Sequence, residues 1–517
     1  MNVKAQKFFS HRATLLLDCI FAALAPLFFW SNRSTVFVFV DGVLFDGFCQ
    51  LIFWLTVINA LFTTVLAALR WRCKSWAEQP PEWCAAAGCA TLCLTVVFAF
   101  VNIGLLAGAG ESVGIVFSDA ADAAPWFIAY VLAVVLAFFF PSISDKRART
   151  VIVVLVLLIV ILGVLFAVYP PVNYEFMSDP MVIDTGSDYS IVFATSAAGT
   201  GYVEYEYGGK SYVVYDENDG RINGSSTIHS VNVPYEHLNG NSYKIGSMRV
   251  FGEYAYGGMN GRTIESESYE FTAVSGEEQT LLCISDWHTR TKKAKSAVSH
   301  LGEYDGVIML GDAAASMQKE ELAAEYIVAF GGDITGGKIP VIFARGNHET
   351  RGAYAGGLKD ALGMHGFYYE TTWGDYRFII LDSAEDKADD HVEYGGMADY
   401  TAFRTRMVEW LESLEKTDKK TVVICHSPKI AAEDYLAERA FAKIDELGAG
   451  IMLSGHYHNC YLEIDEESGF ATYVDGGHNN GVFIASRVKL SASGIELYAC
   501  DVEGAEKLSE AVAWQSA

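Results

Sequence analysis

Five short clusters of Asp, His and Asn recur in the second half of the chain, and each follows an apolar run. They are Asp286-Trp287-His288, Gly311-Asp312, Gly346-Asn347-His348-Glu349, His426-Ser427-Pro428 and Gly455-His456-Tyr457-His458. Imidazole, carboxylate and amide oxygen together suit Mn, Fe, Zn or similar first-row ions better than Ca. Taken singly each cluster is weak: a lone Asp-x-His or His-Ser-Pro is more often structural, and Gly-Asn-His-Glu and Gly-His-x-His are moderately specific. The ordered series of five predicts a metal centre.

The elements that must position these clusters are strands and helices in alternation from Thr280 onward. Apolar strand-like runs are expected at 280–284, 306–310, 341–343, 377–381, 421–425 and 450–453, with helices near 292–302, 318–330, 400–415 and 433–446. Strands that are hydrophobic throughout and alternate with helices indicate a sheet covered on both faces. Ligands of such sheets collect at the carboxyl ends of the strands, and all five clusters fall at strand ends. Because strand ends are rigid, they can hold metal ligands in place.

This ordered set resembles the calcineurin-like metallophosphoesterase superfamily, whose motif series is D-x-H, G-D, G-N-H-[ED], H and G-H-x-H. The resemblance covers about residues 280–500. It implies an α/β fold of four αββα layers, a two-sheet β-sandwich flanked by helices. It also implies a dinuclear, metal-dependent phosphoesterase with two divalent cations, which we expect to be Mn, Fe or Zn. The implied ligands are Asp286, His288, Asp312 and His458 for one cation, and Asp312, Asn347, His426 and His456 for the other.

The resemblance gives His348 a catalytic role beside the metals, where it would protonate the leaving oxygen or stabilise the phosphoryl group. Two cations about 4 Å apart can clamp a phosphoryl group and generate hydroxide near neutral pH. Asp312, a carboxylate with two oxygens, is suited to bridge such a pair. Arg351 is predicted to bind phosphate oxygens, and a surface arginine is the equal alternative. We therefore expect hydrolysis of phosphomonoesters or phosphodiesters, with the physiological substrate left open.

Residues 172–277 precede this domain, and their pattern consists of short alternating segments separated by Gly, Asn and Ser. Regular turns between period-two runs predict a small all-β sandwich, fibronectin III-like, before a catalytic domain at 278–517. This layout is similar to that of purple acid phosphatases. Two positions depart from their pattern, because Ala315 stands in place of a metal-bound Tyr and His288 in place of a Gly. Mn, Fe(II) or Zn is therefore favoured over the Fe(III) of the purple enzymes.

Residues 1–171 are predicted to form a membrane domain with about five transmembrane helices. A bilayer core about 30 Å thick needs roughly 20 mostly apolar residues to be crossed by a helix. Apolar stretches that meet or approach this length lie near 13–30, 48–69, 83–107, 124–140 and 151–169. The first contains Asp18 and the fourth is short, so four spans are the alternative count.

Basic residues predict how these spans are oriented. With five spans, the basic clusters at 4–12, 70–74 and 146–149 all fall on one side of the bilayer. The prediction is a multi-pass protein of the plasma membrane, with its N-terminus in the cytoplasm and its catalytic domain outside the cytoplasm.

Charge is distributed unevenly along the chain. Residues 1–170 hold 10 Lys and Arg and 9 Asp and Glu, whereas the rest holds 27 and 54. The acidic part should repel polyanions, so no nucleic-acid binding is expected. The predicted partners are a phosphoester substrate and the lipid bilayer, and the oligomeric state is left open.

Two other functions stay open at this stage. The membrane helices could form a sensor or transporter with the outer domain as an accessory, although Asp18 and Asn102 are nearly the only polar candidates within the spans. The phosphoesterase domain could instead be a binding module that has lost catalysis, yet none of the seven ligand residues is missing. The stretch 383–399 interrupts the alternating pattern and is expected to form a pocket rim or a solvated acidic loop.

Overall fold

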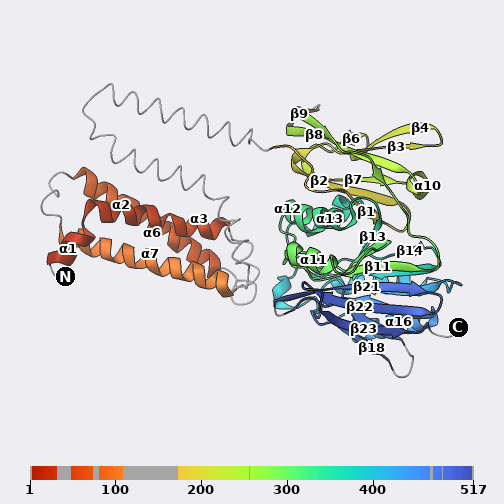
Figure 1. Cartoon of the computed structure of the whole chain (residues 1–517). Helices are drawn as coiled ribbons and strands as arrows, with labels where there is room; N and C mark the ends of the chain where they lie inside the picture. Colours follow the sequence, from red (N-terminus) through yellow and green to blue (C-terminus); the bar gives the residue numbers. More distant parts are fainter. Residues whose placement is uncertain are drawn as a thin grey trace. The chain divides into compact units, whose positions relative to one another are not determined.

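The computed structural model of the chain describes residues 3–31, 48–73, 81–108, 173–254, 257–465, 470–479 and 481–514. The chain divides into two compact units, one made chiefly of residues 1–167 and the other of residues 168–389 and 399–517. The first unit is helical, and the second is built mostly from strands with shorter helices (Figure 1).

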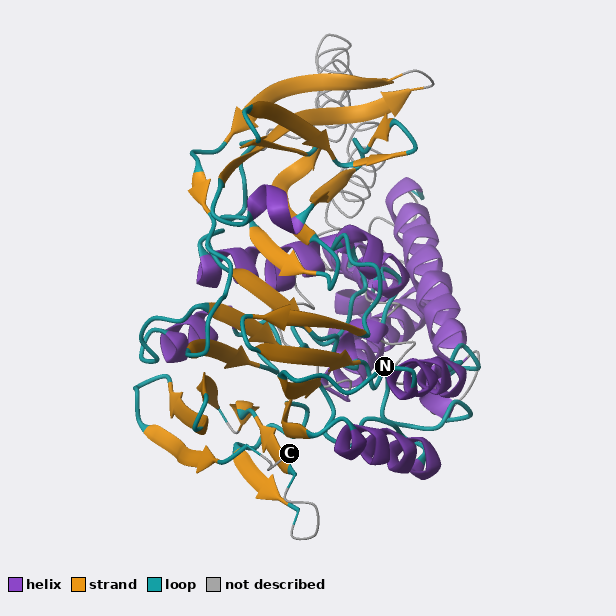
Figure 2. Ribbon diagram, turned by 90° about the vertical axis from the view of Figure 1, so that its right-hand side faces the viewer, coloured by secondary structure: helices purple, strands orange, loops and turns teal. Residues whose placement is uncertain are grey.

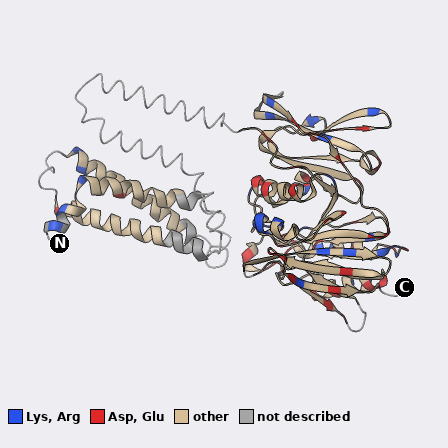
Figure 3. Ribbon diagram, viewed as in Figure 1, with Lys and Arg blue, Asp and Glu red and all other residues tan. Residues whose placement is uncertain are grey.

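Apolar sequences form the helices of the first unit. These are α1 (Val3–Phe9), α2 (Arg12–Ala22), α3 (Leu24–Ser31), α6 (Phe48–Arg72) and α7 (Glu82–Gly108). Two stretches, Leu51–Arg72 and Glu82–Phe100, are long and apolar enough to cross a bilayer, judged by length and composition alone. Charged residues in α6 and α7 stand only at their ends (Figure 3).

The second and third predicted spans are thus single helices. The first predicted span, 13–30, is divided instead between α2 and α3, which meet at Ala23. The fourth and fifth, 124–140 and 151–169, lie outside the described residues. Two candidate spans are weak evidence of membrane association, so the five-helix topology and its orientation stay predictions.

Polar side chains join three helices of the first unit. Asp18 of α2 is 2% exposed, and its carboxylate accepts hydrogen bonds from Thr91 Oγ1 at 2.7 Å and Thr95 Oγ1 at 2.8 Å, both on α7. Asn59 of α6 donates from Nδ2 to Thr95 Oγ1 at 3.1 Å. A buried carboxylate is costly unless donors compensate it, and hydroxyls four residues apart lie on one face of a helix. Asp18 therefore links α2 and α7.

One sheet of the second unit runs through both predicted soluble domains. Its main path has the order β23-β22-β21-β11-β12-β13-β1-β2-β8-β3-β4. β1 (Met181–Asp184) pairs in parallel with β13 (Pro340–Phe343), and β11 (Gln279–Ile284) and β12 (Gly306–Met309) continue the parallel part. The strand pairing therefore crosses the predicted boundary between 277 and 278, which itself stays a prediction.

A sheet-rich region precedes the catalytic part. Its further elements are β2 (Tyr189–Gly199), β3 (Tyr202–Tyr207), β4 (Lys210–Tyr215), β5 (Glu217–Asn218), β6 (Arg221–Ile222), β7 (Ser226–Val233), α10 (Tyr235–Leu238), β8 (Ser242–Tyr254), β9 (Gly257–Glu265) and β10 (Tyr269–Glu270). Alternate residues such as Ile191, Phe193 and Val203 pack in one buried core, as the period-two pattern predicts. The fibronectin III-like topology stays a prediction.

A second sheet has the order β14-β15-β16-β17-β19-β18. Its strands are β14 (Tyr369–Trp373), β15 (Tyr376–Leu381), β16 (Lys420–Cys425), β17 (Ala449–Ser454), β18 (Tyr461–Ile464) and β19 (Ala471–Val474). One face packs against the first sheet, since Phe378 and Ile424 share a core with Leu282. On the other face, Ile379 and Val423 pack with residues of α15 (Tyr400–Glu412) and α16 (Asp434–Glu446).

Helices also cover the first sheet. They are α11 (Thr291–Val298), α12 (Glu320–Ala323) and α13 (Phe330–Thr335), with a π-helical turn at Ala324–Ala329 between the last two. After the second sheet's strands the chain returns to the first through β20 (Gly477–Asn479), β21 (Val482–Ser491), β22 (Gly494–Asp501) and β23 (Glu506–Val512). Short helices lie beside the middle strands of the second unit (Figure 2). The predicted α/β layering of this domain is confirmed.

Candidate metal centre

All five sequence clusters stand directly after strands. Asp286 and His288 follow β11, Asp312 follows β12, and Asn347 and His348 follow β13, all in the first sheet. His426 follows β16, and His456 and His458 follow β17, both in the second sheet. The ligands therefore meet where the edges of two packed sheets come together, and neither sheet alone holds a complete set.

The backbone at this edge adopts an uncommon conformation. Nine non-glycine residues in the described part of the chain have positive φ, and five of them are predicted ligands. Those five are Asp286, His288, Asp312, His456 and His458. Left-handed backbone costs of order 1–3 kcal/mol for a residue with a side chain, so surrounding contacts must impose it. Its concentration here is typical of a functional site.

The motif glycines allow the ligand loops to touch. Gly311 has φ +87°, and a Cβ there would lie 2.2 Å from the backbone nitrogen of Gly346. A Cβ on Gly455 would lie 2.7 Å from Asp286 Oδ2. Larger residues at these two positions would push the loops apart. The glycines of the G-D and G-H-x-H clusters are therefore explained by close packing of the loops around the centre.

The first predicted ligand group converges on one point. His288 Nε2 lies 3.3 Å from His458 Nε2, and Asp286 Oδ1 lies 3.4 Å from His458 Nε2 and 3.9 Å from His288 Nε2. Asp312 Oδ2 is 3.8 Å from His288 Nε2. Possible ligand atoms of Asp286, His288 and His458 all lie within 4.8 Å of one another.

The second group shares Asp312 with the first. Asp312 Oδ2 lies 3.3 Å from His426 Nε2, and possible ligand atoms of Asp312, His426 and His456 lie within 4.8 Å of one another. Asn347 Oδ1 is 3.2 Å from both His426 Nε2 and His456 Nδ1. The structure thus places Asp312 between the two groups, as expected for a bridging carboxylate.

The unused lone pairs of these atoms fit a cation. Asp286 Oδ1 is buried and has no hydrogen-bond partner among the described residues. The other ring nitrogens of His426 and His458 are held by the carbonyls of Leu310 at 2.6 Å and His478 at 2.5 Å, so the Nε2 atoms present lone pairs to the centre. Acceptors that face one another without donors are satisfied by a positive charge between them, and a proton or a metal cation can supply it.

The amide of Asn347 can stand in either of two orientations between His426 and His456. If its amide were turned over, the NH2 group would donate to His426 and His456, and its oxygen would accept from Arg351. That arrangement satisfies the amide in the absence of a cation. A cation beside His426 and His456 would require the other orientation, with the oxygen inward, in which Asn347 can be a ligand.

Burial and charge set the protonation of the imidazoles. Burial lowers the pKa of His288 to about 3 and that of His456 to about 4, so both rings are neutral near pH 7. For His426 burial alone would lower the pKa, but the carboxylate of Asp312 outweighs it and raises the pKa to about 10. A divalent cation between Asp312 and His426 would take the place of that proton.

His348 lies beside both groups, as predicted. Its Nδ1 is 2.7 Å from the carbonyl of Ala315, which leaves Nε2 to face Asp312 Oδ2 at 3.8 Å. Burial lowers the pKa of His348, and the nearby Asp312 acts in the opposite direction. The ring is therefore fixed in orientation and has one nitrogen available for proton transfer at the centre.

Arg351, predicted to bind phosphate, is paired with Glu385. Its Nε lies 2.5 Å from Glu385 Oε1 and its Nη2 lies 2.9 Å from Oε2, and the Glu385 side chain is 2% exposed. Arg351 Nη1 is also 3.1 Å from His348 Nε2. Asn347 Nδ2 contacts Glu385 Oε2 at 3.4 Å. The structure shows an arginine held between His348 and a buried carboxylate, and its contact with phosphate stays a prediction.

Two residues of the site were not assigned a role from the sequence. Glu349, within the G-N-H-E cluster, accepts hydrogen bonds from the backbone N–H groups of Asp312, Ala313 and Gly346 at 2.7–2.8 Å. Glu385 lies in the stretch predicted as a pocket rim. The identity of Glu349 was visible in its motif, whereas nothing in the spacing connects Glu385 with Arg351.

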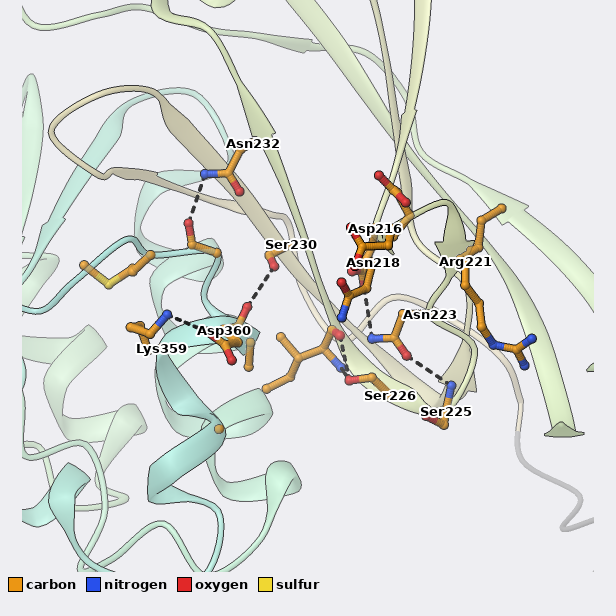
Figure 4. Close-up of a pocket in the computed structure, with 18 of the residues that line it drawn as sticks. Asp216, Asn218, Arg221, Asn223, Ser225, Ser226, Ser230, Asn232, Lys359 and Asp360 are labelled. Atoms are coloured by element: carbon orange, nitrogen blue, oxygen red, sulfur yellow. Dashed lines mark hydrogen bonds and ion pairs between the residues drawn. The ribbon is translucent and has the colours of Figure 1, made fainter.

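A polar cleft of about 1050 Å³ lies elsewhere in the second unit, between residues 216–232 and 354–365 (Figure 4). Asn, Ser and Asp side chains line it, and several are already bonded to neighbours, such as Asn232 to the Gly363 carbonyl at 2.9 Å. None of the predicted site residues lines this cleft. The convergent chemistry therefore lies at the sheet edge and not in this larger hollow.

Comparisons with known proteins agree with the geometry. Residues 279–460 match the family model described as calcineurin-like phosphoesterase, so this part of the chain is a calcineurin-like phosphoesterase domain. The resemblance drawn from the motifs is thereby confirmed. A metal-dependent phosphoesterase is the activity that this family and the clustered His and Asp residues suggest. No curated protein matches the chain.

Solved structures are similar only at low identity. The chain is similar to PhoD, with 12% identity and a TM-score of 0.44 over 67% of this chain and 94% of that one. It is also similar to GAP50, the anchor in the inner membrane complex of Plasmodium, with 14% identity and a TM-score of 0.35 over 47% and 90%. A metallophosphoesterase from Sphaerobacter thermophilus gives 14% identity and a TM-score of 0.21 over 46% and 89%. At these scores the likenesses carry no argument.

Proposed function

We propose that the protein is a membrane-anchored phosphoesterase that hydrolyses phosphomonoesters or phosphodiesters with two divalent cations outside the cytoplasm. The observation that carries the chemistry is the pair of ligand groups that share Asp312. Asp286, His288 and His458 would complete one cation site, and Asn347, His426 and His456 the other. Bound there, two divalent cations supply polarisation of the phosphoryl oxygens and activation of water near neutral pH.

The remaining steps belong to side chains of this chain. His348, oriented by the Ala315 carbonyl, would protonate the leaving oxygen once Nε2 has taken up a proton, or would stabilise the phosphoryl group. Arg351, held by Glu385, would keep His348 in place and add positive charge beside the phosphoryl group. The bonds from Glu349 to three backbone N–H groups would hold the G-D and G-N-H-E loops together during turnover.

Turnover of simple esters by the full chain in detergent tests this proposal. We expect hydrolysis of p-nitrophenyl phosphate or bis(p-nitrophenyl) phosphate to stop with EDTA and to return with Mn, Zn or Fe. Asp312→Ala and His348→Ala should both abolish restored turnover, and only Asp312→Ala should lower the bound metal. Folded, metal-loaded protein without turnover on a broad panel of phosphoesters would overturn the proposal in favour of a binding module.

The membrane part of the proposal rests on α6 and α7, whose apolar lengths suit a bilayer. Added protease should remove an epitope at the C-terminus from intact cells if the catalytic part lies outside.

One observation favours the alternative of a membrane sensor, namely the buried Asp18 with its Thr91 and Thr95 donors. For a passive anchor, Asp18→Asn should leave turnover unchanged in liposomes. A change in turnover without a change in membrane insertion would support the sensor.

A further inference from the structure

A groove of about 550 Å³ is lined in part by residues of two ligand loops of the candidate metal centre. It lies between α16, the loop after β16 and the strands β18 and β19. Its walls include the aromatic rings of Phe441, Tyr457 and Tyr461, and its rim includes Lys429, Asp445 and Glu463. The volume falls in the range of pockets that bind small molecules.

Two ligand loops lead directly into this groove. Lys429 stands three residues after His426, and Tyr457 stands between His456 and His458. The rings of Tyr457 and His456 have centroids 5.3 Å apart, and Tyr457 is 40% exposed. An exposed aromatic side chain between two predicted metal ligands can contact the organic part of a substrate whose phosphoryl group occupies the centre.

Strand register shows the direction in which the groove runs. Tyr461 pairs with Val474, which pairs with Ser454, the last residue of β17 before the G-H-x-H cluster. Tyr461 therefore stands level with the metal-centre edge. Glu463 pairs with Thr472, two residues further from that edge, which corresponds to about 7 Å along a strand. Asp445 lies in the last turn of α16, next to the start of β17 at the opposite edge.

The sign of the charge therefore changes from one end of the groove to the other. Lys429, Tyr457 and Tyr461 belong to the end that adjoins the ligand loops, whereas Glu463 and Asp445 lie toward the far end. Aromatic faces attract cations through their quadrupole, and carboxylates reinforce the attraction. A long polyanion would be repelled by the same carboxylates. A phosphoester that carries a positive charge on its organic group matches this order of charges.

We infer that this groove binds the organic group of the substrate and that this group is cationic, as in phosphoesters of amino alcohols. The inference rests on the proposed function, because it assumes that the phosphoryl group occupies the metal centre. The walls Tyr457 and Tyr461 would contact the ammonium group, and Glu463 and Asp445 would supply the opposite charge. Hydrolysis would form a bond from the oxygen of water to phosphorus and break the phosphorus–oxygen bond to the leaving group, while the proton released by water balances the one taken up by the leaving oxygen.

Two diesters that share the leaving group p-nitrophenol isolate the effect of a positive charge on the organic group. p-Nitrophenyl phosphocholine and p-nitrophenyl 3,3-dimethylbutyl phosphate have the same shape, but a quaternary nitrogen in the first is a carbon in the second. We expect kcat/KM of the full chain, in a detergent without choline, to be roughly ten-fold higher for the choline ester, mainly through KM. Asp445→Asn with Glu463→Gln should reduce the ratio to about two-fold or less, and Tyr457→Ala should also reduce it.

The matched control is Glu438→Gln, which removes one charge from an exposed position of α16 outside the groove. It should leave the ratio unchanged. Equal kcat/KM for the two esters in the unmodified protein would overturn the inference while leaving the proposed hydrolase intact. A preference that survives the double variant would also overturn it.

Binding separates this inference from the proposed function. Calorimetry of the full chain with choline and with 3,3-dimethylbutanol needs no turnover. Selective binding of choline that the double variant abolishes would support the cation groove even if neither ester is hydrolysed. No binding of choline would overturn the inference, whereas the proposed hydrolase would still be decided by turnover on the broad panel of phosphoesters.

Discussion

Two buried carboxylates of the second unit differ in how their oxygens are satisfied. Asp184 accepts hydrogen bonds from Tyr235 Oη at 2.6 Å, Trp373 Nε1 at 2.7 Å, Thr371 Oγ1 at 2.9 Å and Gly186 N at 2.9 Å. Asp286 accepts one on Oδ2, from the backbone N–H of His456 at 2.9 Å, while its Oδ1 has no partner among the described residues. Both side chains are almost completely buried.

The difference separates a structural carboxylate from a ligand. The four donors around Asp184 come from β14, α10 and the loop after β1, so this side chain joins the sheet-rich region to the second sheet. Around Asp286 the free oxygen faces imidazole lone pairs. Burial of a carboxylate alone therefore does not identify a metal site, whereas converging acceptors without donors do.

The largest expected effect comes from Asp286→Asn. It should lower kcat/KM by at least about a thousand-fold, because a predicted ligand is lost and metals contribute several kcal/mol to catalysis. In EDTA, however, the variant should melt no lower than the unmodified protein, since an uncompensated buried charge has been removed. Turnover, bound metal and melting temperature in EDTA check this. A large loss of metal-free stability would show that Asp286 is as structural as Asp184.

Asp184→Asn should give the opposite result. The amide places an NH2 group against four donors, so we expect the free energy of unfolding to fall by roughly 2–3 kcal/mol. Bound metal and kcat/KM of the folded fraction should change little. Urea unfolding followed by tryptophan fluorescence, with metal analysis alongside, measures both. Loss of metal in a stably folded variant would contradict the division between the two carboxylates.

These carboxylates also show how far the sequence could lead. Asp286 was predictable, because it belongs to a short motif at the end of an apolar strand and its partners follow in a recognisable order. Asp184 carries no such signal, since its donors Thr371 and Trp373 lie almost 190 residues away in the chain. The parallel pairing of β1 with β13 was missed for the same reason. Local patterns give strands and motifs, while pairings over long separations depend on packing.

Helix lengths in the first unit illustrate a second limit. The stretch 13–30 has the apolar composition of a single span, yet it is divided at Ala23 into α2 and α3. Composition reports whether a segment suits an apolar environment and not whether it continues as one helix. Glu385 is a third case, because an acidic loop contains several carboxylates and only the fold selects the one that meets Arg351.

Glu385 differs from both of these carboxylates, because it contacts the predicted ligand Asn347 but belongs to neither ligand group. The variant Glu385→Gln tests what such a carboxylate contributes. Loss of the charge that holds Arg351 should lower kcat/KM by about 10–100-fold. This is the range found when residues that hydrogen-bond metal ligands are replaced. The matched control is Glu412→Gln, which breaks an exposed pair with Arg439 of similar geometry, at 2.9 and 2.7 Å. Exposed pairs contribute little, so the control should keep its turnover. Equal effects in both variants would exclude a positioning role for Glu385.

The smallest expected effect is the contribution of Asp184 to the pH dependence of the free energy of unfolding. Burial raises its pKa above the ordinary 3.8, although the four hydrogen bonds act in the opposite direction. A raised pKa means that the folded protein holds the proton more tightly than the unfolded chain. The contribution to stability is therefore complete below about pH 3.8 and is lost as the pH rises through the folded pKa.

Asn does not titrate, so Asp184→Asn should lack this dependence. The difference in unfolding free energy between the unmodified protein and the variant should shrink as the pH rises from 4 to 7, by about 1.4 kcal/mol for each unit by which the pKa is raised. Urea unfolding at several pH values measures the slope. A difference in unfolding free energy that grows with pH would mean that the four donors outweigh burial and that Asp184 is held as a charged carboxylate. Its charge would then be compensated by hydrogen-bond donors, whereas we propose that a cation compensates the charge of Asp286.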